Sequence, residues 1–264
     1  MRAECITDGA GEAHYVIGEG ISLREFASAG RGALGFSTGI ARFSPLAELP
    51  YQVHACGESV TILTARARVL VEGRSYSLSP FDSIHIPANV AYAMQNPNSD
   101  GEMVAHTAFS AAEVTRSRVN GKFRSEDRAH LLPQPGDPES LVRFEHAPEY
   151  ELSENAFFRD LFASRLGSNG ICGGYGRFAP GASLPCHTHK YDESITIVEG
   201  AATCLVAGRR HNLSGYGTAM VPQGLPHRFI NQTNEYMAML WVYAGDEPER
   251  VIVEDSLCSL GVSR

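Results

Sequence analysis

The chain has 264 residues, of which 43% are hydrophobic, and its formal net charge is -8 at pH 7. This length allows one large domain or two of ordinary size. Because the basic residues are scattered and no apolar run approaches the roughly 18 residues of a membrane span, the composition argues against nucleic-acid and membrane partners.

The N-terminal stretch "MRAECITDGAGEAHY" has no apolar core typical of a signal peptide. Six cysteines occur without a CxxC pair or the regular spacing of a disulfide framework. We therefore expect most of them to be reduced, buried thiols, which suits a cytoplasmic protein. Cys186 precedes a histidine, but alternation along a strand would point it to the opposite face.

The first half of the chain is typical of β-structure. "ESVTILTARARVLVEG", from Glu58, alternates and is rich in β-branched residues, and Glu72-Gly73-Arg74 predicts a hairpin turn. "DSIHIPANVAYAMQN" is expected to pair two short strands around a proline-containing turn, and "EMVAHTAFS" to form a last strand. "SRVNGKFRSEDRAHLLPQPGDPES" follows, a charged and then Pro- and Gly-rich stretch that predicts a linker.

The second half repeats the first. "GIARFSPLAELPYQVHACGESVTILTARARVLVEGRSYSLS", from Gly39, aligns without a gap with "GYGRFAPGASLPCHTHKYDESITIVEGAATCLVAGRRHNLS", from Gly174, at an offset of 135 residues. With the register continued to Asn96 over Asn231, roughly a third of the aligned positions are identical. Such a match indicates an internal duplication and therefore two domains. Short, evenly spaced strands favour a barrel or jelly roll in each, so we predict domains at residues 1–115 and 146–264, joined by a linker at 116–145.

The stretch "PCHTHKYDESITIVEG" places His187, His189 and Glu193 at odd-numbered positions, together with Ile195 and Ile197. Residues of one parity share a strand face, so a strand, or two strands broken by a bend at "KYD", would point all of them into the barrel. Buried imidazole and carboxylate groups are costly unless something satisfies them, and a divalent metal would do so.

A His-x-His pair alone is weak evidence, because many such pairs are surface histidines. A further histidine, His227 in "PQGLPHRFIN", supplies a fourth candidate ligand from a separate pair of strands. Phe229 lies two residues beyond it and is expected to line the same cavity with Ile195 and Ile197, although a core aromatic is the simpler interpretation. Met239, Trp241 and Tyr243 share one face of the last strand, which faces either the barrel interior or an interface.

Two spacings resemble the conserved motifs of the cupin superfamily. Gly181-x5-His187-x-His189-x3-Glu193-x6-Gly200 is similar to the first motif, and Pro222-x-Gly224-x2-His227-x3-Asn231 to the second. One departure is Tyr216, which stands where a glycine usually precedes the second motif. With the duplication, the chain resembles a bicupin. The resemblance implies an all-β fold of two tandem double-stranded β-helix (jelly-roll) barrels. It also implies one divalent transition metal (Fe, Mn, Ni, Co, Cu or Zn) bound by His187, His189, Glu193 and His227.

The N-terminal copy departs from the pattern at its ligand positions. In the same register stand Gln52, His54, Glu58 and Tyr92. A neutral amide and a phenol of pKa about 10 make a poor transition-metal site. We therefore predict a degenerate site whose polar groups hydrogen-bond to one another; a weak metal site or a small-ligand pocket are the alternatives.

A metal that accepts five or six ligands keeps one or two positions open when four ligands come from the protein, and open positions favour catalysis over a structural role. Glu193 is the ligand that could dissociate and act as a general base. Bicupin relatives make a dioxygenase-type oxidoreductase acting on a small oxygen-rich molecule the leading hypothesis. A non-oxidative isomerase, decarboxylase, lyase or hydrolase and a non-catalytic small-molecule binding protein are the alternatives. A homodimer is possible by analogy, through the alternating segment "RVIVEDSLCSLGV", which could equally pack on its own chain.

Overall fold

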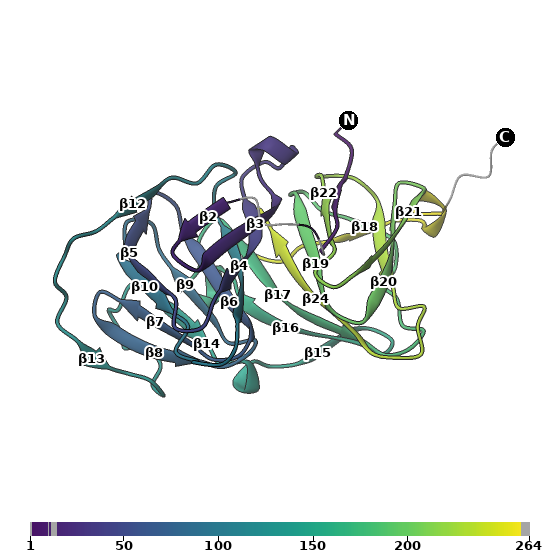
Figure 1. The fold of residues 1–264 in the computed structure, drawn as a ribbon. Coiled ribbons are helices and arrows are strands. Elements are labelled where there is room, and N and C mark those ends of the chain that lie inside the picture. Colours follow the sequence, from purple (N-terminus) through teal and green to yellow (C-terminus); the bar gives the residue numbers. More distant parts are fainter. Residues whose placement is uncertain (1, 10, 12–14, 260–264) are drawn as a thin grey trace.

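The computed structural model describes residues 2–9, 11 and 15–259. Within these ranges the chain forms two β-barrels that lie side by side, the first drawn in purple to teal and the second in teal to yellow (Figure 1). Each barrel consists of two sheets that face each other around an apolar interior. The predicted all-β fold of two tandem jelly-roll barrels is confirmed.

The N-terminal barrel has one seven-stranded and one six-stranded sheet. The first contains, in spatial order, β14 (Ser140–Val142), β9 (Ser83–Ile86), β6 (Glu58–Thr64), β11 (Met103–Phe109), β4 (Ser37–Phe43), β3 (Ile21–Ala27) and β2 (Tyr15–Gly18). The second contains β12 (Arg116–Arg118), β5 (Glu48–His54), β10 (Tyr92–Gln95), β7 (Ala67–Val71), β8 (Arg74–Leu78) and β13 (Glu126–Asp127).

The C-terminal barrel has one seven-stranded and one five-stranded sheet. The first contains β1 (Cys5–Thr7), β22 (Thr218–Val221), β19 (Glu193–Glu199), β24 (Met237–Tyr243), β17 (Cys172–Phe178), β16 (Ala156–Phe162) and β15 (Tyr150–Ser153). The second contains β21 (Arg209–Ser214), β20 (Ala201–Val206), β23 (His227–Ile230), β18 (His187–Thr188) and β25 (Val251–Ile252). The described helices are short 3-10 turns: η1 (Ala29–Arg31), η2 (Phe144–His146), η3 (Ser164–Leu166) and η4 (Asp255–Leu257).

The duplication extends beyond the stretch that the sequence alignment revealed. The offset of 135 residues also relates β2 to β15, β3 to β16 and η1 to η3. The hairpin turns are conserved between the copies: Glu72-Gly73 and Ala207-Gly208 all have positive φ, the backbone of a two-residue type I′ turn. The main difference concerns β5, which has seven residues where β18 has two.

One expectation about strand pairing needs correction. β9 and β10, and likewise β22 and β23, are short strands around a proline-containing turn, but the members of each couple do not pair with each other. The turn carries the chain from one sheet to the facing sheet, as the closure of a jelly roll requires.

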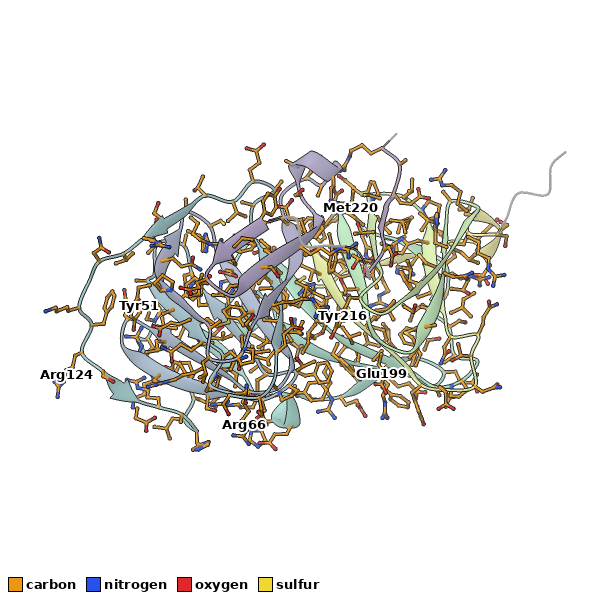
Figure 2. The ribbon with its side chains drawn as sticks, in the orientation of Figure 1. Tyr51, Arg66, Arg124, Glu199, Tyr216 and Met220 are labelled. Atoms are coloured by element: carbon orange, nitrogen blue, oxygen red, sulfur yellow. A yellow bond between two sulfur atoms is a disulfide. The ribbon has the colours of Figure 1, made fainter. Side chains whose placement is uncertain are left out.

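Three clusters of buried apolar side chains hold the molecule together. One fills the N-terminal barrel, a second fills the C-terminal barrel, and a third lies between the barrels. Met220 and Tyr216 belong to this third cluster and lie in the middle of the molecule (Figure 2). Across the same interface the hydroxyls of Thr38 and Ser194 are hydrogen-bonded at 2.9 Å.

The chain also crosses between the barrels. β1 pairs with β22, so the first residues lie on the C-terminal barrel. Residues 116–145, the predicted linker, contribute β12, β13 and β14, which pair with β5, β8 and β9 of the N-terminal barrel. The predicted boundaries therefore enclose a middle segment that is packed against the first barrel.

The expectation of reduced thiols is wrong for one pair of cysteines. Cys186 and Cys258 form a disulfide across 72 residues, whereas Cys5, Cys56, Cys172 and Cys204 are free. Both half-cystines are buried in a small cluster with Leu205, separate from the core of the C-terminal barrel. Sequence spacing gives no signal for this pairing because the two residues meet only when the C-terminal segment returns to β18.

Among the described residues, none of the helices is both long and apolar enough to cross a membrane.

Candidate metal centre

Three strands bring the four predicted ligands together. His187 begins β18, Glu193 begins β19 and His227 begins β23, while His189 follows β18 directly. β18 and β23 are neighbours, and His187 is in register with His227. Glu193 comes from the facing sheet, which it reaches through the bend at residues 190–192. The ligands therefore converge from both sheets across the barrel.

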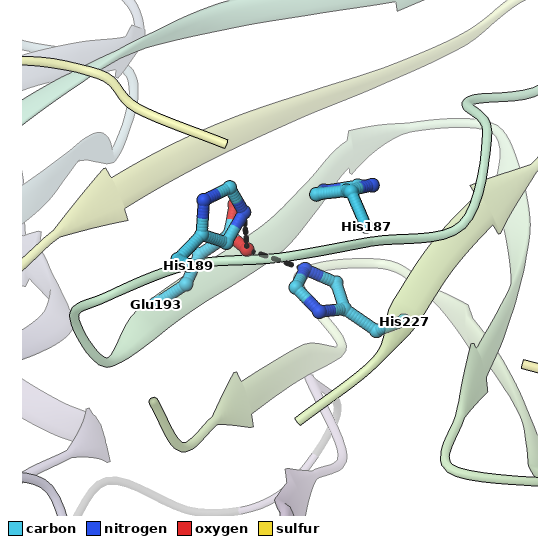
Figure 3. A group of neighbouring side chains, drawn as sticks. All are labelled: His187, His189, Glu193 and His227. Atoms are coloured by element: carbon cyan, nitrogen blue, oxygen red, sulfur yellow. Dashed lines mark hydrogen bonds and ion pairs between the residues drawn. The ribbon is translucent and has the colours of Figure 1, made fainter. Parts of the chain in front are cut away.

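The four side chains form a compact, buried cluster (Figure 3). Their candidate ligand atoms lie within 4.8 Å of one another, and each residue is at most 4% exposed. Burial and the nearby His227 lower the pKa of His187 to about 3, so its imidazole is neutral at physiological pH. A neutral imidazole with a free lone pair is the form that binds a metal.

Backbone carbonyls fix the orientation of all three imidazoles. Nδ1 of His187 lies 2.8 Å from the Pro185 oxygen, Nδ1 of His227 lies 2.9 Å from the Leu225 oxygen, and Nδ1 of His189 lies 2.5 Å from the Glu249 oxygen. A carbonyl only accepts, so each Nδ1 carries the proton and each neutral ring keeps its lone pair on Nε2.

These lone pairs face one carboxylate. Oε2 of Glu193 lies 2.7 Å from Nε2 of His227 and 3.2 Å from Nε2 of His189, and the latter nitrogen is buried without a hydrogen-bond partner. Protonating both His189 and His227 beside the single Glu193 carboxylate would leave a net positive charge in a buried site, which is costly. A divalent transition metal satisfies all four groups at once, and nitrogen and carboxylate donors suit it. The residues present therefore fit a single metal ion.

Asp192 holds the bend that precedes Glu193. Its carboxylate accepts hydrogen bonds from the backbone N–H groups of Leu34 and Gln223 and from the side chain of Arg2. The first two distances are 2.9 and 2.8 Å, and Asp192 is 3% exposed. Residues from both barrels thus fix the position of one metal ligand.

The predicted pocket residues Ile195, Ile197 and Phe229 lie in the core of the C-terminal barrel, each at most 1% exposed. The face that carries Trp241 and Tyr243, which the sequence left open, belongs to the same interior. The Tyr243 ring lies 4.4 Å from that of His189, measured between centroids. Within the part of the chain that the structure describes, Nε1 of Trp241 is buried with no hydrogen-bond partner, so it is an unused N–H donor in this interior.

In the N-terminal barrel, Gln52, His54, Glu58 and Tyr92 also lie together. The Tyr92 hydroxyl is 2.6 Å from Nε2 of Gln52, 3.2 Å from Nε2 of His54, and donates to the carboxyl of Glu58. All four are at most 3% exposed. Burial is the main cause that raises the pKa of Glu58, which favours its neutral form. These polar groups satisfy one another around the phenol.

The C-terminal strap, which we define as residues 249–258, supports the metal ligands, a role that the motif spacings do not indicate. The Glu249 carbonyl binds His189, β25 pairs with β18, and Cys258 is bonded to Cys186, the residue before His187. The segment predicted either to form a dimer or to pack back therefore packs on its own chain, where it supports two metal ligands.

Comparisons with known proteins agree with this architecture. Residues 174–243 match a protein-family model described as a cupin domain, whereas no curated protein matches the chain. Two solved structures illustrate the likeness. Lactobacillus farciminis oxalate decarboxylase in its formate complex is 16% identical, with a TM-score of 0.76 over 96% of this chain and 89% of its own. An oxalate decarboxylase studied for its substrate binding mode and reaction specificity is 15% identical, with a TM-score of 0.75 over 96% and 79%.

At such identities the likeness establishes the fold. Another similar structure, of Bacillus subtilis oxalate decarboxylase, concerns the Mn(II) centres of that protein; it is 16% identical, with a TM-score of 0.74 over 94% of this chain and 79% of its own. The predicted resemblance to the cupin superfamily is confirmed, and the chain has a bicupin architecture with one three-histidine, one-glutamate metal site in its C-terminal barrel.

Proposed function

We propose that the C-terminal barrel is the active site of a metal-dependent enzyme that converts a small, oxygen-rich organic molecule by non-oxidative chemistry, such as decarboxylation or a related lyase or isomerase reaction. The observation that carries the proposal is the buried cluster of three oriented imidazoles and one carboxylate. The barrel folds around its own core, so the metal is not needed as a structural staple.

A divalent metal at this site supplies Lewis-acid polarisation of a substrate oxygen. The surrounding residues supply the rest. Ile195, Ile197 and Phe229 exclude water with their apolar side chains. The Trp241 N–H is buried without an acceptor among the described residues, and we propose that it donates to a substrate oxygen. We propose Glu193 as the general base, because its Oε2 lies 2.7 Å from Nε2 of His227 and 3.2 Å from Nε2 of His189 and would accept a proton if the carboxylate left the metal.

The choice of non-oxidative chemistry is supported by the comparisons. The three solved structures described above are all similar over most of this chain, and all three are of oxalate decarboxylases. The dioxygenase-type reaction that the sequence favoured has no such support and stays the alternative. A non-catalytic binding protein is the third possibility, and a substrate assay separates all three.

The first measurement is the metal content of the untagged protein by mass spectrometry, beside a His187→Ala, His227→Ala double variant. We expect about one equivalent of a divalent transition metal per chain in the wild type and none in the variant, because two of four ligands are lost. A wild-type protein that takes up no metal, even after reconstitution, would overturn the proposal.

The second measurement is turnover of oxalate, pyruvate and acetylacetone, followed by NMR and by CO2 release without oxygen. Anaerobic turnover that disappears in Glu193→Gln supports the proposal. Stoichiometric consumption of O2 would assign the dioxygenase reaction instead, and binding of a probe without turnover would assign a binding protein.

Three further inferences stay predictions. They are the division into residues 1–115, 116–145 and 146–264, the cytoplasmic location, and the homodimer.

A further inference from the structure

Outside the metal centre, the N-terminal barrel contains a cavity of about 430 Å³. Strands β2, β3, β4, β11 and β12 and the segment between β11 and β12 line it. Its apolar wall includes Ile17, Leu23, Phe109 and Val114. The Phe109 ring lies 5.1 Å from that of His54, between centroids, so the cavity borders the degenerate Gln52–Tyr92 cluster. A volume of this size suits a small organic ligand.

Three polar side chains of this wall have buried atoms without partners in the part of the chain that the structure describes. They are the hydroxyls of Ser37 and Thr107 and Nε of Arg116. Ser37 and Thr107 are each 4% exposed, and they stand on the neighbouring strands β4 and β11. Buried polar groups are normally hydrogen-bonded, and each unpaired one costs about 1–3 kcal/mol. All three residues line the same cavity, so a ligand that enters it meets three side chains with unused hydrogen-bonding capacity.

The polar and apolar side chains that line the cavity determine which class of ligand fits it. A guanidinium and two hydroxyls are the donors that recognise a carboxylate, and the apolar wall suits a hydrocarbon tail. Glu25 also lines the cavity, and its negative charge disfavours a second anionic group on the ligand. We propose that the N-terminal barrel is a second, metal-independent binding site for a monocarboxylate with an apolar tail, in which Arg116, Ser37 and Thr107 bind the carboxylate.

This site differs from the metal centre in position and in chemistry. None of His187, His189, Glu193 and His227 lines the cavity. The Tyr92 hydroxyl occupies the centre of the Gln52–Tyr92 cluster, at the position where a metal would otherwise bind. The cavity beside this cluster stays free for a ligand. The inference does not depend on the proposed reaction.

The test is isothermal titration of the full-length, metal-loaded protein with 3-phenylpropionate, and with 3-phenylpropan-1-ol as the neutral analogue. We expect the carboxylate to bind at least tenfold more tightly than the alcohol. Arg116→Gln should weaken the carboxylate about 10- to 100-fold, which corresponds to the loss of charge-assisted hydrogen bonds. Arg118→Gln is the matched control and should bind normally, because Arg118 is an exposed residue of the same strand β12 and does not itself line the cavity.

Thr107→Val tests the same site without a change of charge. Because it replaces a buried hydroxyl that has no partner, the melting temperature should not fall, whereas binding should weaken several-fold. His227→Ala, which disables the metal centre, should leave binding unchanged. The proposal fails if 3-phenylpropionate, benzoate and hexanoate all show no binding at millimolar concentration. It also fails if binding persists in Arg116→Gln and Thr107→Val, or is lost in His227→Ala, which would place the carboxylate at the metal.

Discussion

At the scale of single residues, the metal centre depends on atoms that lack a partner within the protein. Among the described residues, His189 Nε2 and Trp241 Nε1 are buried without a hydrogen-bond partner, although Oε2 of Glu193 lies 3.2 Å from the former, and both belong to the interior of the C-terminal barrel. The first is explained by a metal. We propose that a substrate explains the second, because a donor kept away from water gains a hydrogen bond only when a ligand brings an acceptor.

Replacing Trp241 by Phe tests this role. The ring keeps most of the packing, so metal content and melting temperature should stay close to those of the wild type. We expect kcat/KM for the substrate found in the turnover assay to fall about tenfold, the size of one lost hydrogen bond. Steady-state kinetics check it, and an unchanged kcat/KM would show that the N–H does not contact the substrate.

Burial of His106 predicts that the folded state loses part of its free energy of unfolding in acid. It is 1% exposed on β11, and burial lowers the pKa of its imidazole from 6.5 to about 4. Between these values the unfolded chain binds a proton that the folded chain does not, so stability is lost as the pH falls from about 6.5 towards 4. The loss is up to about 3 kcal/mol.

We expect His106→Leu to lose less stability than the wild type over this pH range, as measured by urea denaturation at several pH values. His146→Leu is the control, since the His146 side chain is 73% exposed. Equal pH dependence in the wild type and in His106→Leu would contradict the assignment.

At the scale of elements, the duplicated strands have diverged where the chemistry lies. Tyr92 and His227 occupy equivalent positions on β10 and β23, yet one closes a cluster of hydrogen bonds and the other binds metal. Because β18 is short, its position depends on pairing with the strap rather than on further residues of its own strand. The strap thus takes over the positioning of His187 and His189.

Cys258→Ser should release the strap. A disulfide that closes a loop of 72 residues contributes about 4 kcal/mol in the chain-entropy view, so we expect a clear drop in melting temperature. Metal affinity, measured by competition with a chelator, should fall about tenfold because the Glu249 carbonyl no longer fixes His189.

Reduction of the wild type with a dithiol should reproduce both effects, and Cys56→Ser, which changes a free cysteine, should show neither. Normal metal affinity in Cys258→Ser would mean that β25 alone holds the strap in place.

At the scale of the whole molecule, the N-terminal residues join the two barrels. β1 extends a sheet of the C-terminal barrel. Next to it, the carboxylate of Glu4 accepts from Arg209 and lies 2.9 Å from Nε2 of His211. Burial opposes ionisation of Glu4, but these partners outweigh it and lower its pKa from 4.5 to about 2.

A carboxyl with a lowered pKa stabilises the folded state fully above pH 4.5, and this contribution is lost as the pH falls towards 2. Glu4→Gln should therefore be less stable than the wild type at pH 6, and the two proteins should converge near pH 2–3. Thermal denaturation across this range checks the prediction. A constant difference between the two proteins at every pH would contradict it.

Much of the fold and of the metal site could be predicted because the relevant information is local. Alternation along "ESITIVEG" identifies β19, positive-φ turns coincide with the predicted hairpins, and the motif spacing places His187, His189 and Glu193 on one side of the chain. The same parity rule assigns Ile195 and Ile197 to the barrel interior. The prediction that β9 and β10 pair with each other was wrong, because which sheet a strand joins depends on closure of the barrel.

By itself the sequence determined the duplication, the β-class, the two cupin-like motifs and the contrast between an intact and a degenerate site. Each of these depends only on residue type and spacing. Only the tertiary structure decided that Cys186 meets Cys258, that the Glu249 carbonyl orients His189, and that Ser37, Thr107 and Arg116 surround one cavity. The reason is physical: these contacts join segments 60 residues or more apart, or strands on different sides of a barrel. Their partners are selected by packing of the folded chain and leave no periodic signal in the sequence.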